Sequence, residues 1–594
     1  MPTSPLIEES HLITFSIHSG GTEISSDYGV LSIKLEQHLN QISEAEIVLL
    51  DGNPASQTFE ITESNTFVPG AEIEIKLGYQ GKNESVFKGI VVKQKINADS
   101  VSGSTLTIIC KDKALKMAIN RNNAIFTNMK DSAAIEKIVR NNGLSSAISE
   151  TSVGHKEIVQ FYATDWDFII SRAEANGMIV VTDNGKLTVA KPDVSASPEL
   201  QLQFGNDIIE FDLEMDATHQ YAETKGNAWD MSTQNTINAI SAEPNVNKQG
   251  NLTGKKLSDV LGGETSNLNS STAITSEDIQ VWSNAALLKS RLSQFRGTLV
   301  FQGSSKAKVN TTINLGGLSS RFNGDAFVSG VIHTVEDGQW HTEVRIGMTA
   351  AWFSENYHIS APEASGLLPG VKGLQTGIVK KMYEDPDNQF RVQVEIPILG
   401  SEGEAVWARL ATFYAGKSIG AYFMPEVGDE VLLGFMNDDP RFPIILGSVY
   451  SSANPAPEIP DKKNSIKTLV TKNNLQLKFD DENKIITIST PSGNTMEFSD
   501  ESEKITISDK NNNKLEMSTD GILLESSKGI HIKAAGDVKI EGNNVSINGQ
   551  SSLKATAANV SIKGDVSTTV NGGAECTISS AGMLSAKGAM VNIN

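Results

Sequence analysis

Histidines and carboxylates gather near residue 340, where the residue types could support metal chemistry. His333 and His341 lie close in sequence to Glu336, Asp337 and Glu343. Imidazole nitrogens and carboxylate oxygens are common ligands of zinc. The stretch reads as a β-hairpin, in which alternate side chains point to opposite faces of the sheet. Because such a hairpin separates these side chains, we expect no metal site here.

Three further groups of acidic residues could bind a cation or act in hydrolysis. Asp385, Asp387 and Asn388 resemble the opening of a calcium-binding loop, but the Gly and Glu that such a loop needs do not follow. We interpret this group as a turn, and Asp438-Asp439 and Asp480-Asp481-Glu482 as solvated turn charges. Paired carboxylates can hydrolyse sugars, yet nothing in the sequence singles out a pair.

Short motifs of enzyme chemistry are absent from the sequence. No GxSxG, HExxH, Walker or CxxC pattern occurs, and the nine histidines are scattered. Cys110 and Cys576 lie far apart without metal-type spacing, so we expect both to be small buried hydrophobic residues. We therefore expect no catalytic residue, no metal and no cofactor.

The charge of the chain disfavours nucleic acid as a partner. The formal net charge is −21, whereas phosphates need a surface rich in Lys and Arg. Five aromatic residues between 407 and 423 could stack on bases, but acidic side chains surround them, and we expect them at barrel and subunit contacts. The aromatic residues are Trp407, Phe413, Tyr414, Tyr422 and Phe423, and the acidic ones are Glu395, Glu402, Glu404, Glu426, Asp429 and Glu430.

The elements that carry these residues are mainly β-strands. Residues 10–110 alternate apolar and polar positions between turns, which predicts a half-buried antiparallel sheet or barrel. Helical spacing follows within 112–180, with Trp166, Ile169, Ile170 and Ala173 on one side of a helix that ends at Asn176-Gly177. Residues 200–355 predict a second barrel with a short helix at 281–295. Residues 231–275 are poor in large apolar residues, so we expect a long exposed insertion.

The whole chain is expected to divide into five stretches. We expect tail-hub-like barrel domains over 1–360, a linker at 361–373, a domain at 374–452, a Pro-rich linker at 453–472 and a repetitive region at 473–594. Residues 374–452 predict five strands separated by turns, which fits a five-stranded barrel of the OB type. The fold class expected for the whole chain is therefore mainly β.

The repetitive region holds pairs of apolar residues spaced two apart. From residue 530 the first five pairs begin at steps of 8, 7, 8 and 7 residues, separated by Gly, Asn, Asp, Ser and Lys. Each repeat predicts a short strand followed by a turn. Between about 475 and 521 the repeat is longer, near ten residues. Eight residues are expected in the core of this region: Ile530, Ile532, Val538, Ile540, Val545, Ile547, Val560 and Ile562.

One chain of this kind cannot bury enough surface to offset the entropy of ordering its turns. A single-chain β-solenoid uses about 20 residues per coil, and a step of seven to eight supplies roughly one third of that. Three identical chains would complete each coil and pair every strand edge between chains. We therefore predict a homotrimer with an intertwined triple-stranded β-helix at its C-terminal end.

Several motifs in 374–500 resemble the VgrG family, the spikes of type VI secretion and related phage-tail-like contractile systems. RVQVEIP, VWARLAT, MPEVGDEVLLGF and DPRFPIILGSVYSSANP are similar to the OB domain of that family, and TPSGNTMEFSDESEKITI to the start of its β-helix. DWDFIISRAEANGM resembles a segment of its N-terminal hub domains. The resemblance implies a trimeric hub, an OB collar and a needle that pierces a target envelope.

The same resemblance implies binding partners for the chain. It implies docking on an inner tube protein and baseplate proteins, effector cargo, and a target membrane that is pierced mechanically. Phage spikes that digest cell wall carry a lysozyme domain after the OB barrel, but here only a linker follows Tyr450. The chain ends without the His-x-His motif of some phage spikes, so a PAAR-type tip protein is the expected cap, bound at Val591, Asn592, Ile593 and Asn594.

The N-terminus lacks a basic segment followed by an apolar one, so we expect no signal peptide. Assembly is then expected in the cytoplasm, followed by delivery outside the cell or into target cells by the apparatus. A spike-associated cell-wall hydrolase and an OB-type nucleic-acid-binding protein remain the alternative functions.

The predicted triple-stranded core can be tested at Val545. Replacing Val545 by Asp would place three carboxylates near one axis, where burial of unpaired charge is costly. We expect Val545→Asp to block assembly or to destabilise the shaft strongly. Resistance of the trimer to heat and detergent measures this, and a variant as resistant as the wild type would contradict the prediction.

Overall fold

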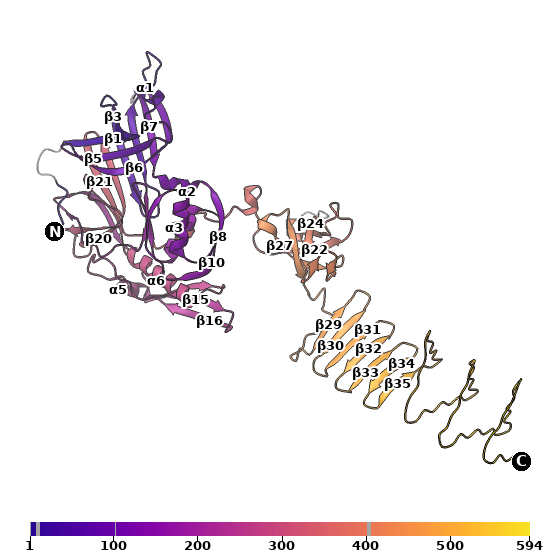
Figure 1. Cartoon of the computed structure of the whole chain (residues 1–594). Coiled ribbons are helices and arrows are strands. Elements are labelled where there is room, and N and C mark those ends of the chain that lie inside the picture. The colour runs from indigo at the N-terminus through magenta and orange to yellow at the C-terminus, as the bar shows by residue number, and fades with distance from the viewer. Residues whose placement is uncertain (1, 7–11, 101–102, 401–404, 594) are drawn as a thin grey trace. The chain divides into compact units, whose positions relative to one another are not determined.

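The computed structural model describes residues 2–6, 12–100, 103–400 and 405–593. It is mainly β and divides into two compact units, one up to Ser448 and one from Val449 (Figure 1). Each unit is described by itself.

The largest element of the first unit is a 13-stranded sheet. Its main path runs β14-β18-β21-β20-β3-β4-β7-β6-β5-β1-β2, and β13 and β19 join it through β20. The strands are β1 (Ile13–Ser19), β2 (Thr22–Glu23), β3 (Val30–His38), β4 (Glu44–Leu50), β5 (Glu72–Tyr79), β6 (Lys82–Asp99), β7 (Gly103–Lys111), β13 (Leu200–Gln203), β14 (Ile208–Met215), β18 (Phe295–Gln302), β19 (Thr312–Gly316), β20 (Gly324–Glu336) and β21 (Gln339–Ile346).

Strands from the two regions expected as separate barrels therefore belong to one sheet. The join is the antiparallel pair of β20 and β3, in which His333 lies opposite Leu35. Each region still has its own hydrophobic core, one around Ile47 and Phe67 and the other around Phe301 and Val344. Local alternation shows that a segment is a strand, but it does not show which distant strand lies beside it.

A smaller helical part follows β7. It contains α2 (Lys116–Ile119), the ribbon of β8 (Arg121–Lys130) and β10 (Gly154–Thr164), α3 (Asp131–Asn141), α4 (Asp165–Ala175), and the sheet of β9 (Ser145–Ile148), β11 (Ile179–Asp183) and β12 (Lys186–Ala190). Trp166, Ile169, Ile170 and Ala173 are all buried, as predicted for one side of α4. Short helices elsewhere are α1 (Glu60–Glu63) and α7 (Phe353–Asn356).

The stretch 231–275 is largely exposed, as expected, but it has regular structure of its own. β16 (Asn235–Ile240) and β17 (Thr265–Ser270) pair with the two edges of β15 (Glu223–Asp230), and α5 (Gly254–Ser258) lies between them in sequence. The 17-residue helix α6 (Ser276–Leu292) packs on this sheet so closely that a Cβ on Gly226 would lie 2.5 Å from Ile279. A segment poor in apolar residues folds here because α6 supplies the apolar side.

Buried ion pairs join the helices. Lys289 of α6 lies 2.7 Å from Glu174 of α4, and both are almost fully buried. The other oxygen of Glu174 accepts the backbone N–H of Phe353 at 2.7 Å. Arg172 makes two hydrogen bonds to the buried carboxylate of Asp131 on α3. Helices α3, α4 and α6 are thus tied by charges that have little access to water.

The five-stranded barrel is confirmed. It closes in the order β22-β23-β24-β28-β27 around a core that includes Val379, Val394 and Leu433. The strands are β22 (Gln375–Lys381), β23 (Val392–Glu395), β24 (Val406–Leu410), β27 (Glu430–Phe435) and β28 (Pro443–Ser448), with the short hairpin β25 (Ala415–Gly416) and β26 (Ile419–Gly420) outside the barrel. Residues 421–425, between β26 and β27, form no strand.

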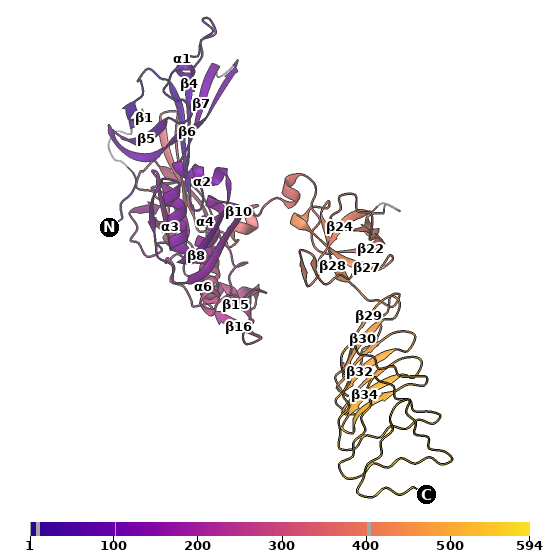
Figure 2. The same cartoon turned by 45° about the vertical axis from the view of Figure 1, so that its right-hand side comes forward.

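The second unit begins with a seven-stranded antiparallel meander. Figure 2 shows its strands following one another along the chain. They are β29 (Ile466–Val470), β30 (Gln476–Asp480), β31 (Ile485–Ser489), β32 (Thr495–Ser499), β33 (Lys504–Ser508), β34 (Lys514–Ser518) and β35 (Gly521–Glu525). β29 lies inside the stretch expected as a linker. Among the described residues after Glu525, up to Ile593, no strand is assigned.

The cysteines differ from one another. Cys110 is fully buried, as predicted, and burial raises the pKa of its thiol to about 12. Cys576 is exposed in the single chain. It lies in the stretch predicted to pack between three chains, so its burial stays a prediction.

The Glu174–Lys289 pair gives a stability prediction. Glu174→Gln would leave the ammonium of Lys289 buried without its counter-charge, which costs about 3–5 kcal/mol when one partner of such a pair is removed. Urea unfolding of the full chain, followed by tryptophan fluorescence, measures the change. Glu150→Gln is the matched control, because the pair of Glu150 with Lys130 is exposed to water and should contribute little to stability. Equal effects of the two substitutions would contradict the prediction.

Candidate trimerisation surface of the spike

The meander places its apolar side chains on one face in two continuous rows. Each strand from β30 to β35 contributes two residues spaced two apart, and the antiparallel register sets them opposite the equivalent pair of the next strand. β29 contributes Leu469, and Lys467 lies opposite Phe479 at its second position. We call this surface the apolar face. Its first row is Leu469, Leu477, Ile488, Met496, Ile507, Leu515 and Leu524, and its second row is Phe479, Ile486, Phe498, Ile505, Met517 and Ile522.

The central row of the opposite face is mostly polar. It contains Thr468, Lys478, Thr487, Glu497, Thr506 and Glu516, with Leu523 at the end. Glu516 accepts hydrogen bonds from Lys514 and Lys504, which lower the pKa of its carboxyl. This face is therefore suited to water.

No other described segment of the second unit covers the apolar face. Ile488 is 47% exposed, Ile507 41% and Leu524 54%, whereas Thr487 and Thr506 on the polar face are only half-exposed. An uncovered apolar patch of this extent marks an interaction surface. A single sheet also needs a second layer to bury its apolar side. The apolar face is thus the candidate functional site.

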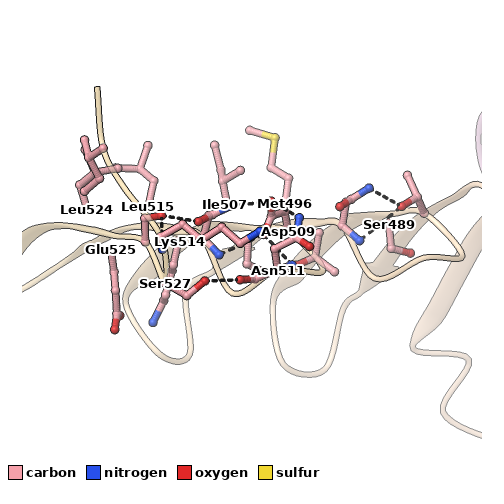
Figure 3. A pocket seen from close by; sticks show the side chains of 18 of the residues that line it. Ser489, Met496, Ile507, Asp509, Asn511, Lys514, Leu515, Leu524, Glu525 and Ser527 are labelled. Carbon is pink, nitrogen blue, oxygen red and sulfur yellow. Dashed lines mark hydrogen bonds between the residues drawn. The ribbon is translucent and has the colours of Figure 1, made fainter. Parts of the chain in front are cut away.

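A groove of about 750 Å³ lies at the C-terminal end of the apolar face. Its apolar lining comes from Ile488, Met496, Ile507, Leu515 and Leu524, and Figure 3 shows the last four following one another along the sheet. The chain leaves the meander at the rim of the groove, so the lining also includes residues 526–530.

Two serine hydroxyls hold the exit of the chain against the preceding turn. Ser526 donates to the side-chain oxygen of Asn513 at 2.6 Å, and Ser527 donates to the backbone oxygen of Asn511 at 2.9 Å. The turn itself is closed by Asp509. Hydrogen bonds from the side chain and backbone of Asn513 hold the pKa of Asp509 at about 2, so the turn stays charged and intact near neutral pH.

Most of the predicted shaft residues are exposed in the single chain and do not line the groove. Ile530 alone among them lines the groove. The others are exposed, at 53% for Val545 and 80% for Ile562. Val591, Asn592 and Ile593 are exposed as well, and Asn594 lies outside the described residues. The shaft and cap assignments therefore remain predictions.

The apolar face itself is a site that the sequence analysis did not name. Its signal was present in the sequence as apolar pairs spaced two apart in the ten-residue repeat, for example Ile486 with Ile488 and Ile505 with Ile507. Only the strand register shows that these pairs join into two unbroken rows.

The groups that suggested chemistry have structural roles. His333 is buried, and its Nδ1 lies 2.9 Å from the hydroxyl of Thr342; burial lowers its pKa to about 4. His341 lies opposite Thr334, one position along the ladder, and so points to the other face, as predicted. Within the described ranges, no three residues among His, Cys, Asp and Glu are grouped closely enough to hold a metal ion.

The acidic turn at Asp385 is confirmed. Its carboxylate accepts a hydrogen bond from the guanidinium of Arg391 and others from the backbone N–H groups of Asp387, Gln389 and Arg391. The Arg391 guanidinium holds the pKa of Asp385 well below its usual range. Asp439 and Arg441 form a similar local pair.

The aromatic residues of the OB region differ from expectation in one respect. Phe413, Tyr414, Tyr422 and Phe423 are exposed and outside the barrel core, so packing within the barrel does not explain them. Trp407 is partly buried, with the guanidinium of Arg391 5.9 Å from its ring centre. Contact with another subunit stays a prediction for this group.

Among the described residues, no helix is long and apolar enough to cross a membrane.

Three family models match the chain in sequence order. The Alg8 N-terminal domain matches residues 9–337, the type VI secretion system/phage-baseplate injector OB domain matches 375–450, and the phage baseplate V C-terminal trimerisation domain matches 485–554. The third match includes β31 to β35 and the predicted shaft residues up to Val545 and Ile547.

Curated relatives match a short part of the chain. The type VI secretion system spike protein VgrG3 of Vibrio cholerae is 40% identical over 82 residues, which are 13% of this chain and 8% of that protein. VgrG5 of Pseudomonas aeruginosa is 35% identical over 103 residues, 16% of this chain and 13% of that protein. A Vibrio cholerae protein named actin cross-linking toxin VgrG1 is 34% identical over 82 residues. The matched segments are thus a small share of these relatives' lengths.

Similar solved structures include the 43 kDa tail protein of prophage MuSo2 from Shewanella oneidensis. That structure is 13% identical, covering 57% of this chain and 99% of its own, with a TM-score of 0.42. A component of the type VI secretion system of E. coli is 14% identical and covers 73% of this chain and 99% of its own, with a TM-score of 0.35. Both scores are too low to carry an argument.

The three matched domains lie in the regions that the fold separates: the large sheet with its helical part, the closed barrel, and the meander with the repeats after it. The Alg8 N-terminal domain spans more than half of the chain. The chain therefore belongs to the family of the Alg8 N-terminal domain, and the injector OB and trimerisation domains that follow make it a spike protein of the VgrG type.

Proposed function

We propose that this chain is the structural spike of a contractile injection apparatus and that it acts as a homotrimer. The observation that carries the proposal is the uncovered apolar face of β29 to β35, which falls within or beside the matched trimerisation domain. A second and a third copy of the same face would bury all three around one axis. The polar faces would then be turned to water.

The physical role of such an assembly is to bear load. In the meander, backbone hydrogen bonds run from strand to strand along the direction in which the strands succeed one another. Three meanders packed by their apolar faces would have to lose side-chain packing in all copies at once before one strand could leave. A shaft of this kind resists compression, which is what a spike driven by sheath contraction requires.

The partners follow from the same proposal. The N-terminal unit would dock on the inner tube protein and baseplate proteins, and a PAAR-type tip protein would cap Val591 to Asn594. Effectors would travel with the spike, and the target membrane would be pierced mechanically. Assembly would take place in the cytoplasm before delivery by the apparatus. The names of the VgrG relatives support this setting, although the matches cover a small part of each.

The proposal assigns no enzymatic activity to the chain. The residues that suggested metal or acid chemistry, His333, Asp385 and Asp439, are engaged in packing and turns. The relative named as an actin cross-linking toxin shares a segment that is 8% of its own length. The engagement of these side chains in packing and turns favours a mechanical component over a hydrolase.

Substitution at the centre of the apolar face tests the homotrimer. Ile507→Asp places a carboxylate in the first row, where three copies would meet, so we expect loss of the trimer. Thr506→Lys is the control, because it introduces a charge in the same strand on the polar face, opposite Glu497 and Glu516, and should leave the trimer intact. Light scattering coupled to gel filtration gives the mass, and electron micrographs show whether a spike is present. A wild-type chain that is monomeric, or an Ile507→Asp chain that is trimeric, would contradict the proposal.

A binding assay tests the nucleic-acid alternative. The exposed aromatic residues at 413–423 could stack on single-stranded DNA, but the acidic chain offers few counter-charges. We expect no retention of single-stranded DNA at about 0.15 M salt and no gain as the salt is lowered, whereas a phosphate-binding protein gains affinity steeply. Salt-dependent binding, weakened by Phe413→Ala, would support the alternative.

A further inference from the structure

The sheet of β15, β16 and β17 in the N-terminal unit has one covered face and one open face. Figure 1 shows α6 beside β15 and β16, and Gly226 of β15 is in close contact with Ile279 of that helix. Side chains alternate between the two faces of a strand. Asn227 and Trp229 therefore lie on the side away from α6, which we call the open face.

Three asparagines lie side by side across the middle of the open face. Asn227 of β15 is directly opposite Asn238 of β16 on one side and Asn269 of β17 on the other. Because neighbouring strands lie about 4.8 Å apart, this asparagine row spans about 10 Å. Trp229 is 42% exposed and stands in the next row, roughly 7 Å along the strand.

The asparagine row does not serve the stability of the sheet. Asparagine is depleted in strands, where threonine is the favoured small polar residue. Asn238 and Asn269 are also exposed, so they contribute little packing. Residues that oppose the local structure without a gain in stability are expected at functional positions.

The amides of the row are placed to bind hydroxyl groups. Nδ2 of Asn227 donates to Oδ1 of Asn269 at 3.0 Å, which fixes these two side chains relative to each other. Within the described chain, neither they nor Asn238 make another side-chain hydrogen bond. Each amide has two donors and one acceptor, so most of the row's hydrogen-bonding capacity is open to solvent. A hydroxyl group both donates and accepts, and it can pair with either end of an amide.

Trp229 adds an apolar surface beside these polar groups. A sugar ring has the matching construction, because its C–H face can pack on an indole while its hydroxyl groups point outward to the amides. The open face is also neutral in a chain of net charge −21, since Lys225 and Glu223 of β15 balance each other there. An uncharged ligand is the electrostatic complement of such a surface.

Other classes of ligand fit the open face less well. Protein interfaces have an apolar centre, whereas here the asparagine row separates Trp229 from the exposed Ile240. Nucleic acid needs several cations, and Lys225 is the one cation that the described strands place on this face. Small molecules bind in concave sites. The surface of a sheet suits an extended polymer that lies along it.

We propose that the open face of β15, β16 and β17 binds a neutral polysaccharide, a β-1,4-linked chain of glucose-type rings. One ring stacks on Trp229, and hydroxyl groups of this ring and the next bind Asn227, Asn238 and Asn269. The row of about 10 Å is as long as two such rings. This binding requires neither the homotrimer nor movement of the spike, so it stands apart from the proposed function.

Calorimetric titration of the full chain with cellotetraose and with chitotetraose tests the proposal. We expect binding of at least one of these two oligosaccharides. Trp229→Ala removes the stacking surface and should weaken this binding at least about tenfold. Asn238→Ala removes one amide at the exposed edge of the sheet and should weaken it about fivefold. Phe161→Ala is the matched control, because Phe161 is an exposed aromatic residue on β10 of the same unit, and this variant should bind like the wild type.

Fluorescence separates stacking from a general loss of structure. A ring that stacks on the indole should change the tryptophan emission of the wild type. Trp229→Phe keeps an aromatic surface, so we expect it to retain most of the affinity and to lose the emission change. An emission change that persists in Trp229→Phe would overturn the proposal.

Three further results would also overturn it. They are a wild-type chain that binds neither oligosaccharide, a Trp229→Ala variant with unchanged affinity, and a preference for an anionic polymer. Heparin is the probe for the last result. Heparin that binds more tightly than both oligosaccharides, with an affinity that falls with salt and is lost in Lys225→Ala, would show that the open face takes a charged ligand instead.

Discussion

The spike depends on one constraint: a sheet with a fully apolar face needs something to cover it. Within the chain, β29 to β35 satisfy their backbone hydrogen bonds but leave two rows of large apolar side chains in contact with water. A globular protein covers such a face with helices or a second sheet. No described segment of the second unit supplies either, and in the proposed homotrimer the cover is another copy of the same face.

The N-terminal unit, in contrast, covers its apolar side chains with residues of its own chain. The OB barrel closes on itself, so its five strands have no free edge within the barrel and its core is filled from its own chain. The 13-stranded sheet joins two hydrophobic cores through the pairing of β20 with β3, and buried charges such as Glu174 and Lys289 tie the helices together. The hydrophobic cores of this unit are thus filled by side chains of its own chain.

In both units, residue types that could bind metals or act as acids and bases have structural roles instead. Asp385, Asp439 and Asp509 each close a turn by accepting several hydrogen bonds, which keeps them charged. His333 is neutral and packed beside Trp340. Such sites explain why acidic and histidine-rich stretches in the sequence look like candidate metal sites although their geometry separates or occupies the ligands.

Much of the architecture could be read from the sequence, and the reason is local. Alternation with a period of two and turns rich in Gly, Asn and Asp predict strands wherever they occur, so the OB strands, the apolar side of α4 and the apolar pairs after Gly529 were all visible in the sequence. The resemblance of 374–500 to spike proteins rests on motifs of the same local kind. Tertiary structure alone decided which strands are neighbours. The joining of two expected barrels into one sheet, the folding of 231–275 against α6 and the alignment of single pairs into two unbroken rows all depend on contacts between distant residues, and the period of a strand carries no information about its partner.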